Sequence, residues 1–333
     1  MNGKTNCPIC STDIDLKAFK EVYISPFNNQ EYKRYVCPKC DIHWWEPLKI
    51  IPEFYESEVF ATQIVFHDGM VNRLKDHHKA FFKYFPTNVK GKLLDIGCGD
   101  GRFIKHAKEQ GFEVFGIDFD QKSIEKLKEN PGIDKVFSMS FDEFYEYAKT
   151  KGLKFDVITF FEVLEHQDKP RKFLEMVKEL LNYCGYTAGS VPNRESISTR
   201  EMHVKKSWID FPPHHFLRFS KLSLEKTLSI SGFKEIEIYK SDFPFEEILP
   251  FFEKTIFGND KIKIKIKSML LGDERKAKSY YIEELSEVES KNIKLSILKV
   301  IKNVTSILLL PLLSVYVGGF KDNGFSLYFQ ATI

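Results

Sequence analysis

The sequence predicts an α/β protein built on a doubly wound, mostly parallel sheet, with a small cysteine-bearing module before it and a helical insertion before its last strand. Three observations support this fold class. A short apolar run, residues 92–96, breaks into a glycine-rich turn and continues as a helical segment. Two C-P-x-C motifs lie near the amino terminus. The most apolar stretch of the chain, residues 297–318, precedes a strand-like segment, GFSLYFQATI.

The glycine-rich turn predicts a ligand site. Residues 92–96 resemble a buried strand, and the segment RFIKHAKEQG that follows the turn has apolar residues at helical spacing. Between them lie Gly97, Gly99 and Gly101, which allow the backbone to approach a ligand closely. In doubly wound sheets, ligands bind at the carboxyl ends of the strands, so we expect a ligand against this turn.

Two details separate this turn from the dinucleotide pattern G-x-G-x-x-G. That pattern requires a glycine at position 102, where the chain has Arg102. The next apolar run, FEVFGID, ends in Asp118, which is placed to accept hydrogen bonds from both hydroxyls of a ribose. An ordinary α/β turn with a solvated acid is the alternative.

The segment LLDIGCGDG and the acid at Asp118 resemble the first motif and the second strand of class I S-adenosylmethionine-dependent methyltransferases. The resemblance implies a Rossmann-like methyltransferase sheet and S-adenosylmethionine as the cofactor. It also implies that Gly97, Cys98 and Gly99 line the methionine and ribose of the cofactor. Asp118 is then expected to bind the ribose diol, and Phe119 to lie against the adenine.

The adenine pocket departs from the family pattern. Family members often have an acid after the third strand, where this chain reads VFSMSFDEF. Asp142 is therefore a candidate, and backbone groups near Met139 and Ser140 are the alternative. The residues that we expect to bind the cofactor are Asp95, Gly97, Cys98, Gly99, Asp118, Phe119, Met139, Ser140 and Phe160.

The resemblance covers about residues 88 to 240 and the last strand. KFDVITFF resembles the fourth strand, and the tail that follows it implies that Glu162, Glu165 and His166 lie near the transferred methyl group. A helix over residues 171–181, a turn at Cys184-Gly185 and a fifth strand ending in SVPNRE come next. HHFLRFSKLSLEKTLSISGFKEIEIY then resembles a helix and the sixth strand, and GFSLYFQATI the last strand. These motifs specify the cofactor and the fold but not the substrate.

Three histidines are candidates for a catalytic base. A sulfonium donor already carries an activated methyl group, so the enzyme must align a nucleophile and, for some acceptors, remove its proton. An unperturbed histidine titrates near pH 6.5, which suits this role. We rank His215, in FPPHHFLRF, and His166 ahead of His214, with a structural hydrogen-bonding role as the alternative for each. Glu162 is expected to orient the substrate or the cofactor amine.

The two C-P-x-C motifs predict a zinc ribbon. The intervening residues read as a β-hairpin around Asn28-Asn29, and no signal peptide precedes the cysteines, which disfavours disulfides. A site with four thiolates and no open position is structural rather than catalytic. The expected ligands of a tetrahedral Zn²⁺ are Cys7, Cys10, Cys37 and Cys40.

We expect five segments along the chain. The helix predicted over residues 71–85 has His77 and His78 on its polar side, so both are expected to be solvated. The segments are a zinc ribbon (1–46), a helical linker or cap (47–87), the S-adenosylmethionine-binding core (88–245), a helical insertion (246–320) and the last strand of the core sheet (321–333).

The apolar stretch at 297–318 has two interpretations. Its uncharged part, residues 303–319, is shorter than the roughly 20 apolar residues of a spanning helix and contains Pro311. A single crossing also conflicts with a last strand that returns to the core sheet. We therefore expect a buried helix of the insertion or, as the alternative, a helix lying on a membrane or a partner.

Composition restricts the substrate only loosely. The net charge is +2, from 49 basic and 47 acidic residues, which argues against a protein built chiefly to bind nucleic acid. Ribbon-bearing proteins of this kind resemble bacterial methyltransferases of sugars and other small metabolites, so a sugar-like small molecule, free or nucleotide-linked, is the first hypothesis. The alternatives are an RNA methyltransferase that reads RNA with its ribbon and the Trp44-Trp45 pair, a membrane-docked enzyme with a lipid-linked substrate, and a non-catalytic scaffold. We expect a cytoplasmic protein, at the membrane only in the docked case.

Overall fold

A computed structural model defines residues 3–51, 54, 74–130, 132–242 and 322–333 of the chain. By their contacts, residues 1–241 and 324–333 form one compact unit, and residues 242–323 form a second. The first unit contains both the cysteine-rich amino-terminal module and the α/β core, and the elements below belong to it.

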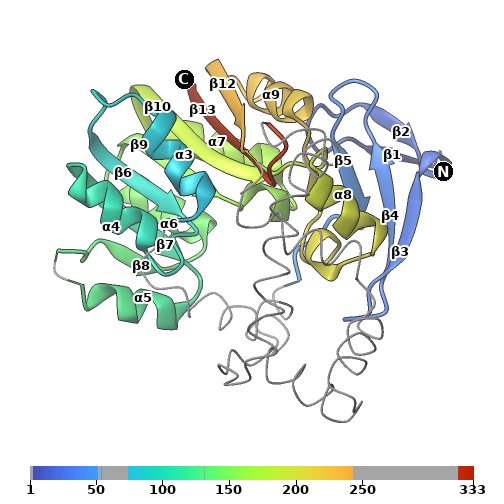
Figure 1. Cartoon of the computed structure of the whole chain (residues 1–333), viewed down its shortest axis with the longest axis horizontal. Helices are drawn as coiled ribbons and strands as arrows, with labels where there is room; N and C mark the ends of the chain where they lie inside the picture. Colours follow the sequence, from blue (N-terminus) through green and yellow to red (C-terminus); the bar gives the residue numbers. More distant parts are fainter. Residues whose placement is uncertain (1–2, 52–53, 55–73, 131, 243–321) are drawn as a thin grey trace, which may run out of the picture. The chain divides into compact units, whose positions relative to one another are not determined.

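A seven-stranded sheet lies at the centre of this unit, in the order β12-β13-β10-β9-β6-β7-β8 (Figure 1). Strands β8, β7, β6, β9 and β10 are parallel, and β13 runs antiparallel to both β10 and β12. The carboxyl ends of the parallel strands therefore share one edge, where ligands bind in such sheets. The strands are β6 (Gly91–Ile96), β7 (Phe112–Asp118), β8 (Val136–Ser138), β9 (Phe155–Phe161), β10 (Leu181–Pro192), β12 (Lys234–Lys240) and β13 (Ser326–Thr332).

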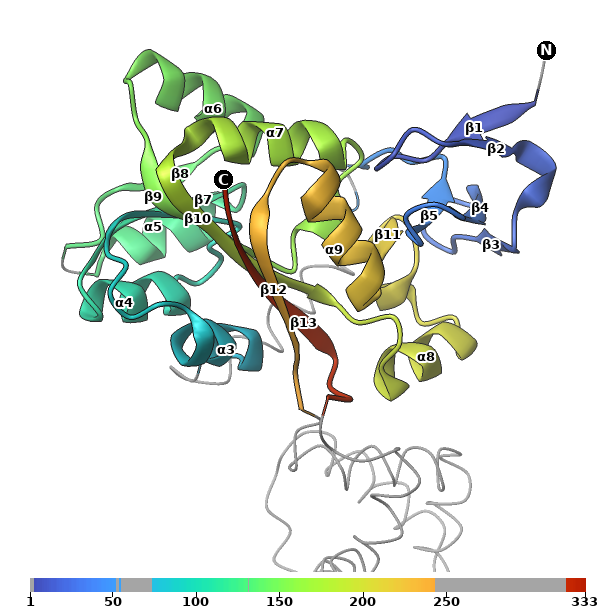
Figure 2. The ribbon, with the colours of Figure 1, turned by 90° about the horizontal axis from the view of Figure 1, so that it is seen from above.

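Helices cover both faces of the sheet (Figure 2). Helices α3 (Asp76–Tyr84), α4 (Arg102–Glu109) and α5 (Gln121–Lys128) pack on one face, against residues such as Leu93 and Val157. Helices α6 (Phe141–Thr150), α7 (Pro170–Leu180) and α9 (Lys221–Ile230) pack on the other, against Leu94 and Ile158. Because both faces are buried, the central strands are almost continuously apolar.

The amino-terminal module is a small β-structure that is joined to the core by a strand. A hairpin pairs β1 (Lys4–Asn6) with β2 (Asp13–Asp15), and a second sheet has the order β11-β5-β4-β3. Strands β3 (Glu21–Ile24), β4 (Glu31–Val36) and β5 (His43–Glu46) belong to the module, whereas β11 (Leu217–Arg218) belongs to the core. The backbone pairing of Leu217 with Trp44 and of Arg218 with His43 thus makes one sheet from two parts of the chain.

The remaining elements are one short helix and three short turns. They are helix α8 (Ile197–Val204) and three short 3₁₀ turns, η1 (Leu16–Ala18), η2 (Leu164–His166) and η3 (Trp208–Asp210). Turn η2 follows β9, and η3 precedes the segment that leads into β11. These two turns bring their residues to the carboxyl edge of the sheet.

The predicted α/β fold class is confirmed, with two local corrections. The turn expected at Cys184-Gly185 is a bulge within β10, where the register against β9 shifts between Leu181 and Tyr186. His77 and His78 are not solvated as predicted. His78 is buried against Phe103 and Phe161, and the His77 ring stacks on Phe161 with 5.5 Å between ring centroids.

Several predictions lie wholly or largely outside the described residues. They concern the helical insertion, the membrane-contacting stretch at 297–318 and most of the linker between the ribbon and α3. Within the ranges that the structure describes, no helix is long and apolar enough to cross a membrane.

Candidate active site

The turn after β6 and the end of β7 form one side of the site. The backbone N–H of Gly97 donates to the carbonyl of Ile117 at 2.8 Å, and that of Cys98 donates to the same carbonyl at 3.0 Å. The Asp118 carboxylate accepts from the N–H of Gly99 at 2.9 Å and from that of Asp120 at 3.0 Å. These bonds hold Asp118 against the glycine turn.

The surface of this turn has room for a ligand. Gly99 has a positive φ of 48°, and a Cβ atom built there would meet no atom within 4 Å. Gly97 has a φ of 77°, and a Cβ atom there would approach Val163 Cγ2 to 2.8 Å. Phe119, directly after Asp118, is 62% exposed although it is aromatic. A glycine cradle, an adjacent carboxylate and a largely exposed aromatic ring fit a nucleoside-containing ligand such as S-adenosylmethionine.

The pKa values of Asp118 and Asp95, which lie at this edge, are both raised. Burial raises the pKa of Asp118 above its usual range, although backbone N–H groups oppose the shift. Asp95 is only 2% exposed, and burial, reinforced by the nearby Asp118, raises its pKa to about 8. Its Oδ1 atom accepts a hydrogen bond from Thr159 Oγ1 at 2.7 Å, so the Asp95 side chain faces the strands rather than the open edge.

Four of the other expected cofactor residues have different surroundings. The N–H of Met139 donates to the Asp118 carbonyl at 3.1 Å, which places Met139 beside the cradle. The Ser140 side chain caps α6 in a capping box with Glu143. The side chain of Phe160 is fully buried against Phe173 and Phe329, and its contact with the cofactor stays a prediction. Cys98 lies in the turn but is itself buried.

Three histidines meet on the other side of the site. The ring centroids of His166 and His214 are 4.7 Å apart, those of His166 and His215 are 4.9 Å apart, and those of His214 and His215 are 4.5 Å apart. Each ring offers a nitrogen within 4.8 Å of the others, a spacing that would also allow a metal ion. The sequence predicted all three as candidates, and the structure brings them together.

Backbone hydrogen bonds fix the orientation of two of these rings. The Nδ1 atom of His166 lies 2.6 Å from the carbonyl of His214, and the Nδ1 atom of His214 lies 2.9 Å from the carbonyl of Ile209. Because a carbonyl oxygen can only accept, each Nδ1 carries the proton when the ring is neutral. The Nε2 atoms of both rings then present lone pairs.

The two rings differ from His215 in their surroundings. Burial, reinforced by the neighbouring His215, lowers the pKa of His166 to about 3. The pKa of His214 is lowered well below its usual value for the same reason. His215, by contrast, lies between two carboxylates, with Nε2 3.9 Å from Glu165 and Nδ1 4.0 Å from Asp210. Asp210 is the acid that sets His215 apart, because the Nε2 atom of His166 lies 3.7 Å from the same Glu165 oxygen. An ionised carboxylate beside the ring can balance the charge of an accepted proton, so His215 is the first candidate for the base.

Glu165 is an unusual buried acid. Its side chain is 0% exposed, and neither carboxylate oxygen has a hydrogen-bond partner among the described residues. Burial and the neighbouring Glu162 raise its pKa well above the usual range. A buried carboxyl group without partners is costly, and such groups are concentrated at functional sites. Glu165 therefore belongs to the histidine pocket, beside His166 and His215.

A family model described as a methyltransferase domain matches residues 67–238, slightly more than half of the chain. The chain belongs to this family. The predicted enzyme class, an S-adenosylmethionine-dependent methyltransferase, is thereby confirmed at the level of the domain.

Curated relatives of this methyltransferase match only in part. The mitochondrial ubiquinone biosynthesis O-methyltransferase of Schizosaccharomyces pombe is 35% identical over 92 residues, which are 26% of this chain and 33% of that protein. The ubiquinone biosynthesis O-methyltransferase of Azoarcus sp. is 29% identical over 155 residues, 45% of this chain and 58% of that protein. The methyltransferase thus spans from a third to somewhat over half the length of these relatives.

Solved structures give similarly general likenesses. An S-adenosylmethionine-dependent methyltransferase from Archaeoglobus fulgidus superposes with a TM-score of 0.44 at 19% identity, over 77% of this chain and 92% of that one. The phosphoethanolamine N-methyltransferase 2 of Haemonchus contortus has a TM-score of 0.46 at 14% identity, over 94% of this chain and 70% of that one.

Glu162 and His77 line the methyltransferase site between the two sides. Glu162 has a left-handed φ of 56°, and its Oε1 atom accepts hydrogen bonds from Ser190 at 2.6 Å and from Ser326 at 3.2 Å. The Nδ1 atom of His77 lies 3.9 Å from the same oxygen. Sequence reasoning missed His77, although His78, Phe81 and Phe85 share one helical face and predict that this helix turns its histidines toward the core.

Aromatic side chains border the histidines of the methyltransferase. Trp208 lies 5.7 Å from His214 between ring centroids, and Phe54 lies 5.8 Å from it. Phe54 also contacts Phe27, which belongs to the amino-terminal module, at 5.2 Å. The sequence carried no signal for this aromatic border, because its members are far apart along the chain.

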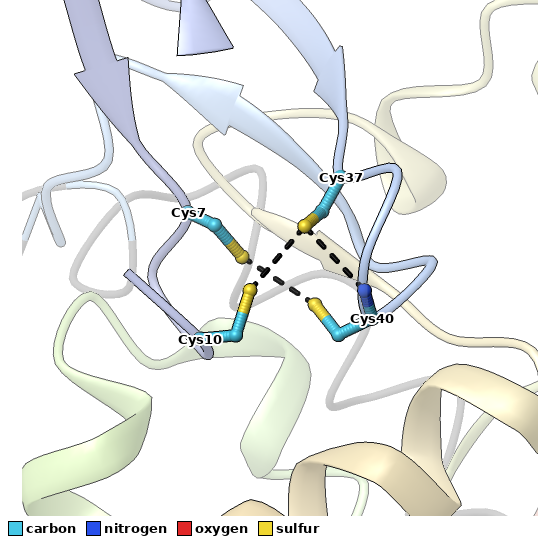
Figure 3. Close-up of side chains that lie close together, drawn as sticks. All are labelled: Cys7, Cys10, Cys37 and Cys40. Atoms are coloured by element: carbon cyan, nitrogen blue, oxygen red, sulfur yellow. Dashed lines mark hydrogen bonds between the residues drawn. The ribbon is translucent and has the colours of Figure 1, made fainter. Parts of the chain in front are cut away.

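The four cysteines of the amino-terminal module point toward one another (Figure 3). The Sγ atoms of Cys7 and Cys40 are 3.5 Å apart, and those of Cys10 and Cys37 are 3.4 Å apart. Four sulfurs at about 2.3 Å from a tetrahedral Zn²⁺ are separated by roughly 3.8 Å, so these spacings fit a zinc ion and are too long for disulfides.

The two cysteine turns also have the same backbone pattern. In the first, the N–H of Cys7 donates to the Thr12 carbonyl and that of Ser11 donates to the Cys7 carbonyl. In the second, the N–H of Cys37 donates to the Ile42 carbonyl and that of Asp41 to the Cys37 carbonyl. This repeated turn and the donor set fit the predicted structural zinc.

Proposed function

We propose that this methyltransferase transfers a methyl group from S-adenosylmethionine to a hydroxyl or carbon of a small, ring-containing polar molecule, with a sugar as the first candidate. The observation that carries the proposal is the position of His215 between the carboxylates of Glu165 and Asp210, beside the carboxyl edge that holds the glycine cradle and Asp118. A base at the cofactor edge is the arrangement that deprotonation of an acceptor requires.

The cofactor would be held by the glycine turn and by Asp118. When bound, S-adenosylmethionine supplies a methyl group that is already activated by its positive sulfur. Gly97 and Gly99 keep the backbone free of side chains where the ribose and methionine would lie, and Asp118 offers its carboxylate to the ribose diol. The exposed ring of Phe119 offers a face for the adenine. Asp95, Met139 and Ser140 stay predictions as cofactor contacts.

His215 would take the proton of the acceptor. As the acceptor forms its bond to the methyl carbon, its proton passes to an imidazole nitrogen, and the positive charge that appears on the ring is balanced by Asp210. His166 and His214 are weaker candidates, because their low pKa values disfavour the protonated ring. We infer that these two rings shape the pocket, and that Glu162 orients the acceptor or the amine of the cofactor.

The aromatic border supports a ring-shaped acceptor. Trp208, which is partly exposed next to His214, offers a flat apolar face to one side of a sugar or an aromatic ring, and the buried Phe54 packs against Trp208 and His214. A phenolic acceptor is the second candidate, because the curated relatives are named as ubiquinone biosynthesis O-methyltransferases. The RNA alternative loses its proposed reader, because Trp44 and Trp45 are both 0% exposed and cannot stack on bases.

Two further predictions remain proposals. A structural zinc ion would be bound by the four cysteine thiolates of the ribbon. A cytoplasmic location, with contact between residues 297–318 and a membrane surface as the alternative, rests on the sequence alone.

The test is transfer of a labelled methyl group from S-adenosylmethionine into a fractionated extract of the cell from which the protein comes. The extract is divided into small polar molecules, aromatic metabolites, lipids and RNA, and Asp118→Ala enzyme is the control. Label in the polar fraction supports the sugar, and label in the aromatic fraction supports the phenol. Label confined to RNA or lipid, or no label in any fraction, contradicts the proposal.

A further inference from the structure

A network of charged side chains outside the pocket joins the ribbon to the histidine segment. Within the ribbon, the Nε atom of Arg34 donates to Glu21 Oε2 at 2.9 Å. The Nε2 atom of His203, on α8 of the core, lies 2.8 Å from the same carboxylate oxygen. Arg218, on β11, forms an ion pair with Asp210, and both side chains are almost completely buried. Buried charges of this kind need partners, so each member depends on the others.

The hydrogen bonds of this network have a defined direction. An Nη1 atom of Arg218 lies 2.5 Å from the Nδ1 atom of His203. Because a guanidinium can only donate, Nδ1 of His203 accepts and its proton is on Nε2, from which it is donated to Glu21. His203 therefore links Arg218 in the core to Glu21 in the ribbon through one tautomer.

The network ends at His215. Asp210 Oδ1 lies 4.0 Å from His215 Nδ1, while Asp210 Oδ2 lies 3.6 Å from His203 Nδ1. Burial alone would favour the neutral acid, but the neighbouring rings of His203 and His215 and the charge of Arg218 lower the pKa of Asp210 to about 2. Asp210 is therefore ionised at neutral pH and faces the ring nitrogen opposite Glu165.

Backbone bonds tie the same segment to the ribbon. The N–H of Trp45 donates to the carbonyl of Phe216 at 3.1 Å, and the N–H of Phe216 donates to the carbonyl of Glu165 at 3.0 Å. Phe216, the residue after His215, is thus held by the ribbon on one side and by turn η2 on the other. A displacement of β5 would move His215 directly.

We propose that Asp210 is a positioning residue that keeps the proton of neutral His215 on Nδ1, and that the ribbon, through Glu21 and His203, keeps the Asp210–Arg218 pair in place. The ribbon is then a structural part of the catalytic pocket and not a separate binding module. The proposal deepens the proposed function, since it rests on His215 as the base. A buried carboxylate that orients a histidine base has a large effect on rate in other enzymes, because it selects the reactive tautomer.

Several charged and titratable groups face His215, and the test must distinguish the effect of Asp210 from theirs. The charged and titratable groups that face it are Glu165 and His166 from η2, the adjacent His214, Asp210 from η3, and, within electrostatic range, Glu162 at the end of β9. Asp210 differs from the rest because it is both ionised and linked to the ribbon. Changing Asp210 or Glu21 leaves the other four groups in place.

The experiment is a pH titration of imidazole nitrogen signals by NMR on the zinc-loaded full chain. The signals of His215 are identified as those that are missing from the spectrum of the His215→Gln variant. In Asp210→Asn, we expect the neutral ring to shift toward the Nε2–H tautomer. Glu21→Gln is expected to shift the tautomer balance in the same direction by less. Asp13→Asn is the matched control, because Asp13 is an exposed ribbon acid that pairs only with Lys4 among the contacts described.

Binding of S-adenosylmethionine, measured by calorimetry, reports whether each variant is folded. If the Asp210→Asn variant unfolds because Arg218 has lost its charged partner, the Glu21→Gln variant still tests the link to the ribbon, because Glu21 lies outside the pocket. Signals of His215 in Glu21→Gln that match those of Asp13→Asn overturn the role of the ribbon. Unchanged signals in folded Asp210→Asn overturn the role of Asp210. If His215→Gln still transfers methyl groups, the proposed base is wrong, whatever the NMR result.

Discussion

The two sides of the candidate site are built in different ways. The cofactor edge is local, since Gly97, Gly99 and Asp118 lie within about one β-α-β unit and are joined by backbone hydrogen bonds. The histidine pocket is assembled from distant segments, and its members are held by buried ion pairs and by the ribbon strand β5. We therefore expect the cofactor edge to survive damage to the ribbon, whereas the histidine pocket should not.

The largest expected effect is that of removing the proposed zinc ion. A structural zinc site contributes folding free energy directly, and binding to zinc-finger peptides is worth about 10–16 kcal/mol. When a chelator removes the metal, we expect hydrogen exchange to rise steeply in residues 3–46 and in β11, while β6 and β7 stay protected. An equal rise in hydrogen exchange in β5, β6 and β7 would show that the cofactor edge and the histidine pocket do not unfold separately.

Replacing the proposed base comes next. His215→Gln should lower the rate of methyl transfer by about 10²- to 10⁴-fold, because a positioned general base contributes that much. Its affinity for S-adenosylmethionine should change little, since His215 is on the other side of the site. His106→Gln on α4, which alters an exposed histidine, is the control. A transfer rate within a few-fold of the wild type for His215→Gln would remove His215 from the mechanism.

The cofactor edge has its own test in Asp118→Ala. Loss of one or two charge-assisted bonds should weaken binding of S-adenosylmethionine by about 1.5–3 kcal/mol for each bond. Glu113→Ala, at the opposite end of β7, changes an exposed acid that pairs with Lys135 and serves as the control. Equal dissociation constants for the two variants, measured by calorimetry, would contradict the ribose assignment.

The smallest expected effect concerns Asp95 and pH. The pKa of Asp95 is raised in the folded protein to about 8 from an ordinary value of 3.8, so folding favours its protonated form. Its contribution to stability is complete below about pH 4 and is lost as the pH rises toward and through 8. Between pH 6 and 8 this amounts to about 2 kcal/mol.

Asp95→Asn should remove this dependence while keeping the acceptor oxygen for Thr159. Thermal unfolding of both proteins at pH 6 and pH 8 is the measurement. We expect the wild type to lose more stability than the variant over this interval. Parallel losses would place the pKa of Asp95 in its ordinary range.

The sequence predicted the local side of the site well. The strand, the glycine turn, the helix and Asp118 are contiguous signals, and the structure places Asp118 against the Gly99 N–H as expected for one β-α-β unit. It also predicted that His166, His214 and His215 belong to one function. Phe160 stays a prediction as a cofactor contact, and its side chain lies in the core because side chains alternate along β9.

The histidine pocket, which is assembled from distant segments, could not be predicted in the same way. Asp210 and Glu21 acquire their roles only when α8, η3 and the ribbon meet, and no spacing in the sequence reports that contact. Trp44 and Trp45 were candidates for an exposed reader because nothing in the sequence reveals that β5 is covered on both faces. Trp44 stacks on Tyr35, and Trp45 packs against Phe211 of the core.

The most direct test of the central inference, that the zinc ribbon helps to build the catalytic pocket, is a paired measurement on one metal-depleted sample. The dissociation constant of S-adenosylmethionine and the rate of methyl transfer are measured before depletion, after it, and after zinc is restored. We predict that the rate falls by at least about 100-fold, as for loss of a general base, while the dissociation constant changes by no more than a few-fold, and that zinc restores the rate. An unchanged rate, or equal losses of rate and affinity, would contradict the inference.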